Sequence, residues 1–331
     1  MNRDNTIDIL KFIAIFMVIC GHTFQYFGIG VEYLNIPFFK ITTMIQMPLF
    51  TFISGYVSYK AITQYPIKQI FSSRARSLLW PMCVFSTLMF VITLPLIWQH
   101  ADFQLIIPKY VGSIIYSYWY IWVILYSICS AYLSNILLGY KGLLISLLIV
   151  ILVPFNIPIP HILYYKAMYP FFVGGLIFYK YDLFDFIVSY KKVFIALLSL
   201  IFIGCYYWYD YNNVFYFFKQ LPLNQCISSY LHMLISGFCG ICLIYILVKF
   251  LGGGKHKYTK IMMYLGQYTF GLYMLQGIVF KIVENNNLFI TNYLLLSLIA
   301  IGGFASMCLC IYLISHSEFL SKHLLGKFNT I

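Results

Sequence analysis

Long apolar runs are the feature that most constrains how this chain can fold. A helix of about 20 apolar residues crosses the hydrocarbon core of a bilayer, and runs of this kind recur from one end of the sequence to the other. We count ten, at 7–28, 41–60, 78–98, 113–137, 141–157, 167–180, 193–210, 226–250, 261–283 and 290–314. The sequence therefore predicts an all-α, polytopic membrane helix bundle with about ten transmembrane helices.

The composition supports the same class of protein. The 331 residues are 62% hydrophobic and 9% charged, whereas about a quarter of the residues in soluble domains are charged. The segments are too long and too uniformly apolar for the alternating strands of a membrane β-barrel. The first run lacks a small-residue cleavage site, which indicates a retained helix rather than a signal peptide. Without a repeat, linker or soluble part, we expect one integral membrane domain over 1–331.

The net charge of +12 is explained by topology. If the N-terminus is cytoplasmic, five of the 21 Lys and Arg residues, among them Lys109 and Lys281, fall on the outer side and the other sixteen on the inner side. Because cytoplasmic loops collect Lys and Arg, this bias predicts that both termini are cytoplasmic. An even number of helices follows, and a nucleic-acid partner is not needed to explain the charge.

The nine cysteines lie mostly within apolar runs. Cys239 and Cys242 have CxxC spacing, but Ile, Leu and Gly surround them, which favours buried structural thiols over a metal or redox site. We expect no bound metal.

The first apolar run carries three ionisable residues on one face. Each residue of an α-helix advances by about 100°, so His22 returns to within about 20° of Lys11 and about 40° of Asp8. His22 also lies about 16 Å beyond Lys11 along the axis. With Lys11 at the cytoplasmic boundary, His22 would lie near the middle of the bilayer, where ionisable groups usually mark function.

Each of these residues has a structural alternative. Asp8 and Lys11 have the i,i+3 spacing of an ion pair at a helix end, and they could equally shape a cytoplasmic entrance. His22 could be a hydrogen-bonded interior residue. Its depth and alignment favour a functional role, and an imidazole, with an unperturbed pKa close to neutrality, is suited to act as a base.

Several motifs resemble those of the acyltransferase-3 family, integral membrane enzymes that O-acylate bacterial surface glycans and related acceptors. The spacing from Lys11 to His22 resembles the basic residue, ten residues and His of that family's first helix. Four further segments resemble its second span, its Arg-rich turn, its aromatic helix start and its penultimate-helix motif, in that order. They are MPLFTFISGYVSYK (47–60), SRARSLLWP (73–81), YWYIWVIL (118–125) and LGQYTFGLYMLQG (265–277).

Two positions depart from the family pattern. The penultimate-helix motif commonly ends in His, whereas this chain has Gln276, which forms hydrogen bonds but cannot take up a proton. The basic turn reads Arg74-Ala-Arg76, with one intervening residue where two are more usual. The resemblance therefore does not supply a second catalytic base, and it leaves the geometry of the arginines open.

The resemblance implies transfer of an acyl group, most often acetyl, from cytoplasmic acyl-coenzyme A to a hydroxyl of an extracytoplasmic glycan or membrane-linked sugar. The protein would lie in the bacterial cytoplasmic membrane and hold no permanent cofactor. His22 would be the general base, with direct attack by the acceptor and a transient acyl-histidine both open. Lys11, Arg74, Arg76 and Lys68 are our candidates for donor binding, because arginine and lysine bind phosphates; positive-inside topology is the alternative.

Further residues could support the reaction or line the acceptor cavity. Ser54, beside Gly55, is a possible nucleophile, although small residues more often serve close helix packing. His232 is a second intramembrane histidine with either a cavity or a packing role. Trp119 and Tyr120 could stack on a sugar or anchor the helix at the interface. Asp8 and Gln276 complete this set.

Two other classes of function compete with an enzyme. A polysaccharide exporter is the main alternative, but transporters often show internal repeats, and we find none. A purely structural assembly partner would leave the polar face of the first helix unexplained.

Overall fold

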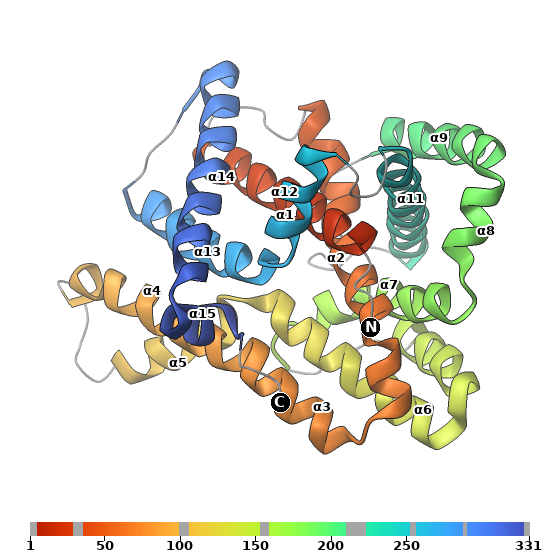
Figure 1. Cartoon of the computed structure of the whole chain (residues 1–331), viewed down its shortest axis with the longest axis horizontal. Helices are drawn as coiled ribbons and strands as arrows, with labels where there is room; N and C mark the ends of the chain where they lie inside the picture. The colour runs from red at the N-terminus through yellow and green to blue at the C-terminus, as the bar shows by residue number, and fades with distance from the viewer. Residues whose placement is uncertain are drawn as a thin grey trace. The chain divides into compact units, whose positions relative to one another are not determined.

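The computed structural model describes residues 5–28, 36–98, 106–152, 159–209, 223–251, 256–286 and 290–327. Every regular element in these ranges is a helix (Figure 1). The chain forms two compact units of interleaved segments: Met1–Val18, Leu34–Pro66 and Val123–Gln267 in the first, and Ile19–Tyr33, Ile67–Trp122 and Tyr268–Ile331 in the second. Helix α1 (Asn5–Phe27) begins in the first unit and ends in the second.

The first unit is built around two helices that approach very closely. Its other helices are α2 (Pro37–Gln64), α6 (Trp119–Leu152, from Val123 onward), α7 (Ile162–Lys180), α8 (Leu183–Ser189), α9 (Lys191–Tyr207), α11 (Leu223–Phe250) and α12 (Lys257–Gly266). In α2, Gly55 lies against the backbone of Phe172 in α7, and Gly175 of α7 lies against the backbone of Phe52 in α2. A side chain at either glycine would push the helices apart, so small residues at this contact serve packing.

Helix α6 contains a break that the sequence pattern anticipates. Gly139 has φ 59° and ψ −149°, a conformation that only glycine adopts readily. Beyond it, Gly142 lies against the carbonyl of Ser134. The break falls between the predicted runs 113–137 and 141–157; the end of the second of these runs lies outside the described residues.

Other predicted runs also differ from a single straight helix, among them 113–137, which is divided between α5 (Ile106–Tyr116) and α6 (Trp119–Leu152). The run 193–210 corresponds to α9, which joins α8 at a bend of 100°; residue 210 lies outside the described ranges. The run 261–283 is divided between α12 and α13 (Thr269–Asn286), since the helix is interrupted between Gly266 and Thr269. Apolar composition alone does not reveal these features.

The second unit holds the remaining helices. They are α3 (Ile67–Arg74), the short π-helix η2 (Ala75–Leu79), α4 (Trp80–Trp98), α5 (Ile106–Tyr116), α13, α14 (Tyr293–His316) and α15 (Glu318–Leu325). Helix α4 packs against α5, α13 and α15. At the α4–α15 contact, Trp80 Nε1 donates to His323 Nδ1 at 3.0 Å. Helix α4 therefore forms the centre of this unit.

Five helical stretches within the described residues are long and apolar enough to cross a membrane. They are Asn5–Phe27, Ile67–Leu94, Trp119–Ile151, Ile227–Phe250 and Tyr293–His316, and the bent pair α8–α9 would be a sixth. Helix α2 has 28 residues, but it includes polar residues such as Gln46 and Lys60 and is not among them. The structure confirms a multi-pass helical membrane protein; the number of ten spans and the side of the termini stay predictions.

Candidate functional site

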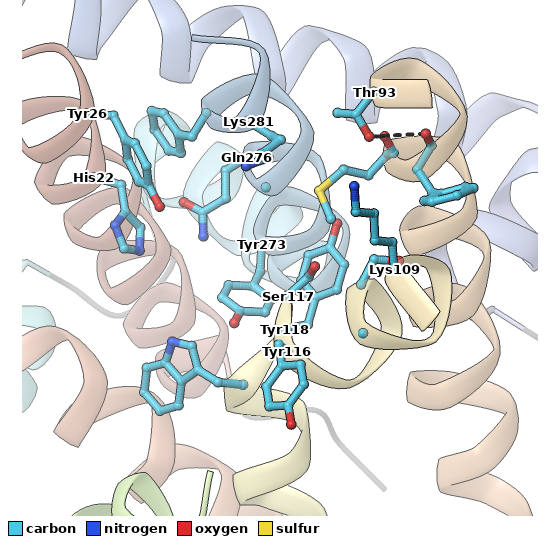
Figure 2. Close-up of a pocket in the computed structure, with 17 residues that line it drawn as sticks. His22, Tyr26, Thr93, Lys109, Tyr116, Ser117, Tyr118, Tyr273, Gln276 and Lys281 are labelled. Atoms are coloured by element: carbon cyan, nitrogen blue, oxygen red, sulfur yellow. Dashed lines mark hydrogen bonds between the residues drawn. The ribbon is translucent and has the colours of Figure 1, made fainter. Parts of the chain in front are cut away.

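A pocket in the second unit contains His22. It encloses about 580 Å³, within the usual range for small-molecule sites. The lining combines aromatic rings with a few polar groups (Figure 2). The lining residues are His22, Tyr26, Met89, Phe90, Thr93, Lys109, Gly112, Ser113, Tyr116, Ser117, Tyr118, Trp119, Tyr273, Gln276, Gly277, Phe280 and Lys281.

A neighbouring amide on the same helix orients the imidazole of His22. His22 Nδ1 lies 3.2 Å from Gln25 Oε1. Because an amide oxygen only accepts hydrogen bonds, Nδ1 is the nitrogen that carries the proton. In a neutral imidazole, Nε2 then has the free lone pair. His22 is half-buried in the pocket wall, so this arrangement suits a base.

Aromatic rings hold the histidine from two helices. The His22 ring centroid lies 6.0 Å from that of Tyr26 and 5.8 Å from that of Phe280 in α13. Tyr26 and Phe280 stack on each other with centroids 5.2 Å apart. Tyr26 comes one helical turn after His22, so both side chains leave α1 on the same face. These contacts join α1 to α13 at the pocket.

Tyr118, in the pocket wall, joins the start of α6 to α13. Its side chain is 2% exposed, and its hydroxyl donates to the carbonyl of Met274 at 3.2 Å. The Tyr118 ring occupies the space that a Cβ atom at position 277 would need. Gly277 therefore gives the ring room to lie against α13.

Helix α5 forms the opposite wall of the pocket and is fixed to α4. The Tyr110 hydroxyl lies 2.9 Å from Thr87 Oγ1, and the Tyr110 ring meets Phe90 edge-on at 5.2 Å. Lys109, the neighbour of Tyr110, lines the pocket on the side of Thr93, away from His22 (Figure 2).

The structure brings some of the residues singled out by the sequence to this pocket. His22, Trp119 and Gln276 all line it. Tyr120 is not a lining residue, but its ring meets that of Tyr273, which lines the pocket, at 5.8 Å. Residues from α1, the start of α6 and α13 thus converge.

Other candidates lie in the first unit and not in this pocket. Lys11 Nζ lies 3.4 Å from Asp8 Oδ1, the i,i+3 ion pair expected as an alternative, and Asp8 is buried. Ser54 is half-buried in α2, next to the tightly packed Gly55. His232 Nε2 lies 2.8 Å from the carbonyl oxygen of Cys205.

The sequence matches the acyltransferase domain family over residues 4–316. The chain belongs to the acyltransferase-3 family. Two proteins named nodulation protein NolL are similar to it. The one from Mesorhizobium japonicum is 30% identical over 302 residues, covering 86% of this chain and 78% of the relative. The one from Sinorhizobium fredii is 26% identical over 294 residues, covering 86% of this chain and 80% of the relative. No solved structure matches the chain.

Family membership and the long apolar helices together identify a membrane acyltransferase. The Lys11–His22 signature lies on the continuous helix α1. Gln276, in the position where the family commonly has His, lies in the same pocket as His22.

The basic residues of the Arg-rich turn follow one another along α3 and η2. Lys68 and Arg76 are exposed, and Arg74 is half-buried. Arg76 donates to Ser72, from Nε to its carbonyl at 3.3 Å and from Nη2 to its hydroxyl at 3.4 Å. Arg74 thus lies at the end of α3 and Arg76 on the π-helix η2 that follows it.

Several residues in or beside the pocket were not among the site candidates from the sequence. Gln25 and Tyr26 follow His22 by three and four residues, and helical spacing could have identified them. Lys281 follows Gln276 by five residues on α13. Lys109 reaches the pocket only because α5 folds back on α4, which no local pattern reveals.

Proposed function

We propose that this membrane acyltransferase moves an acyl group, acetyl in the first instance, from acyl-coenzyme A to a hydroxyl of an extracytoplasmic glycan or membrane-linked sugar. One observation carries the proposal: His22 lines a pocket of about 580 Å³ with Nδ1 engaged by Gln25. Nε2 is then the atom that takes a proton. The aromatic and hydroxyl-bearing lining suits a sugar.

In the proposed reaction, His22 Nε2 accepts the proton of the acceptor hydroxyl while the oxygen of that hydroxyl attacks the carbonyl carbon of the thioester. A tetrahedral oxyanion forms, which needs hydrogen-bond donors; we assign the Tyr26 hydroxyl, one turn from His22, to this role. The carbon–sulfur bond then breaks, and the leaving thiolate takes the proton from the imidazolium. The same lone pair would serve a transient acyl-histidine, which rapid denaturation of labelled enzyme at neutral pH would detect.

We assign donor binding to basic residues on the proposed cytoplasmic side. Lys68 and Arg74 lie on α3, and Arg76 on η2. We propose that Arg74 and Arg76 contact different phosphates of coenzyme A. Lys11, which forms an ion pair with Asp8, contributes positive charge at the entrance.

The proposed setting is the bacterial cytoplasmic membrane. The charge bias supports ten spans with both termini inside, and we propose that residues 1–331 act as one acyltransferase domain. We propose that Ser54 and His232 serve packing, in keeping with their surroundings in the first unit.

The test uses purified protein in nanodiscs with acetyl-coenzyme A labelled in the acetyl group. Slow hydrolysis of the donor is followed together with label transfer, so that the assay does not depend on knowing the acceptor. We expect turnover in the wild type and its loss in His22→Ala, with unchanged size-exclusion and circular dichroism profiles. Donor turnover that is absent from the wild type would contradict the proposal and favour an exporter. Turnover that persists in His22→Ala would remove His22 as the base.

A further inference from the structure

Two lysines line the pocket that contains His22. Lys109 lies on α5 and Lys281 on α13, and none of the described lining residues is Asp or Glu. Figure 2 shows Lys281 near the His22 side and Lys109 on the other side with Thr93. A cleft with charges of one sign and apolar walls concentrates its electric field. The pocket is therefore suited to an anion.

Lys109 is held in place for such a role. Within the described part of the chain, its amine makes no hydrogen bond, ion pair or ring contact. Its neighbour Tyr110 fixes the helix through the 2.9 Å contact with Thr87 and the ring contact with Phe90. An ammonium group on an anchored helix at the wall of a pocket is available to a ligand.

Gln276 adds an independent sign of a ligand. Its side chain is 3% exposed and lines the pocket, and its Oε1 has no hydrogen-bond partner among the described residues. A buried acceptor without a donor is energetically unfavourable. A ligand hydroxyl placed at this oxygen would remove that penalty.

We propose that the acceptor is a phosphorylated sugar. Lys109 and Lys281 contact its phosphate, and Gln276 Oε1 accepts a hydrogen bond from a sugar hydroxyl next to the one that is acylated. This inference rests on the proposed function. The charge bias of the sequence places both lysines on the outer side of the membrane, which assigns them to the acceptor rather than to coenzyme A. The phosphate could belong to a free sugar phosphate or link the sugar to a lipid.

The test measures binding of three probes to the full chain in nanodiscs of phosphatidylcholine. The probes are N-acetylglucosamine, its 1-phosphate, and N-acetylglucosamine joined to farnesol through diphosphate. We expect the two phosphorylated probes to bind at least tenfold more tightly than the neutral sugar. Lys109→Gln should reduce this preference below threefold, whereas Lys109→Arg and the surface control Lys260→Gln should retain it.

Comparison of the two phosphorylated probes identifies the source of the phosphate. Tighter binding of the farnesyl probe would assign a lipid-linked acceptor, and equal binding would assign a free sugar phosphate; either result supports the proposal. Equal or undetectable binding of neutral and phosphorylated sugars by the wild type would overturn it. A raised KM for acetyl-coenzyme A in Lys109→Gln, without a change in probe preference, would also overturn it by making Lys109 a donor contact.

Hydrolysis of acetyl-coenzyme A by the same samples separates this proposal from the proposed function. A preference for phosphorylated probes in a protein without donor turnover would remove the acyl-transfer reaction and keep the phosphate site. Donor turnover without a phosphate preference would keep the reaction and remove the site.

Discussion

His22 and His232 are both histidines on long apolar helices, yet their surroundings differ. His22 lies in a pocket, and Gln25 engages its Nδ1. His232, on α11, donates from Nε2 to the carbonyl of Cys205 at 2.8 Å, and its Nδ1 is buried without a partner among the described residues. Both residues lie in helical stretches apolar enough to cross a membrane, but their hydrogen bonds differ.

The difference shows what makes an intramembrane histidine a base. A base needs a lone pair that faces space large enough for a substrate. At His22 the hydrogen bond uses the nitrogen that must carry the proton, which leaves the other nitrogen for the pocket. At His232 the hydrogen bond ties one helix to the end of another, as a structural residue would.

Replacement of each histidine by glutamine should give the largest contrast. General base catalysis typically contributes about 10²–10⁴-fold, so His22→Gln should lower acetyl-coenzyme A turnover by at least 100-fold. His232→Gln should leave turnover per folded molecule within about twofold of the wild type. The measurement is the initial rate at saturating donor, with folded protein quantified by size-exclusion chromatography. Equal losses in both variants would contradict the comparison.

The dependence of turnover on pH should further distinguish His22 from His232. An imidazolium has no lone pair with which to take up the hydroxyl proton. Turnover of the wild type should therefore fall as the pH is lowered through the range in which His22 is protonated. His232→Gln should have the same profile. A changed pH profile in His232→Gln, which keeps His22, would mean that His232 and not His22 controls the pH dependence of turnover.

A smaller effect is expected from the amide that orients His22. Gln25→Leu removes the acceptor for His22 Nδ1. The net value of such a hydrogen bond is about 0.5–1.5 kcal/mol, which corresponds to a roughly 2–10-fold lower turnover rate. Gln25→Glu keeps an acceptor at this place and should recover most of the activity. Unchanged turnover in Gln25→Leu would mean that the pocket itself holds the ring in its active orientation.

The smallest effect concerns stability. His232→Gln should lower the free energy of unfolding by about 1 kcal/mol, because the hydrogen bond to the Cys205 carbonyl is lost or distorted. The change is measured as a shift of the thermal unfolding midpoint in detergent. Ile227→Ala, an exposed position on the same helix, is a matched control that should shift the midpoint less. A larger shift in the control would remove the structural role of His232.

Much of the fold follows from local pattern. Apolar runs predict the long helices, and Gly139 lies between two of these runs. Local pattern does not predict the bend of 100° between α8 and α9 or the interruption of the helix before Thr269. Both depend on how neighbouring helices pack, and mean hydropathy does not report packing.

The candidate site was only partly predictable for the same reason. His22 was found from its depth on an apolar helix, and Gln276 and Trp119 from motifs of the family that the chain resembles. Lys109 comes from a short helix whose position depends on the contact of Tyr110 with α4. The sequence marks the basic turn as a donor-binding candidate and leaves the geometry of its arginines open; the structure places Arg74 at the end of α3 and Arg76 on η2.

The break at Gly139 has a consequence for biosynthesis. The two parts of α6 are joined without a polar loop, and Lys180 lies 3.3 Å from the ring centroid of Tyr140, the residue after the break. A ribosome would therefore deliver both parts to the insertion machinery almost together. We expect the two parts to be inserted together, with the break kept near the surface by Lys141, which follows Tyr140 in the chain.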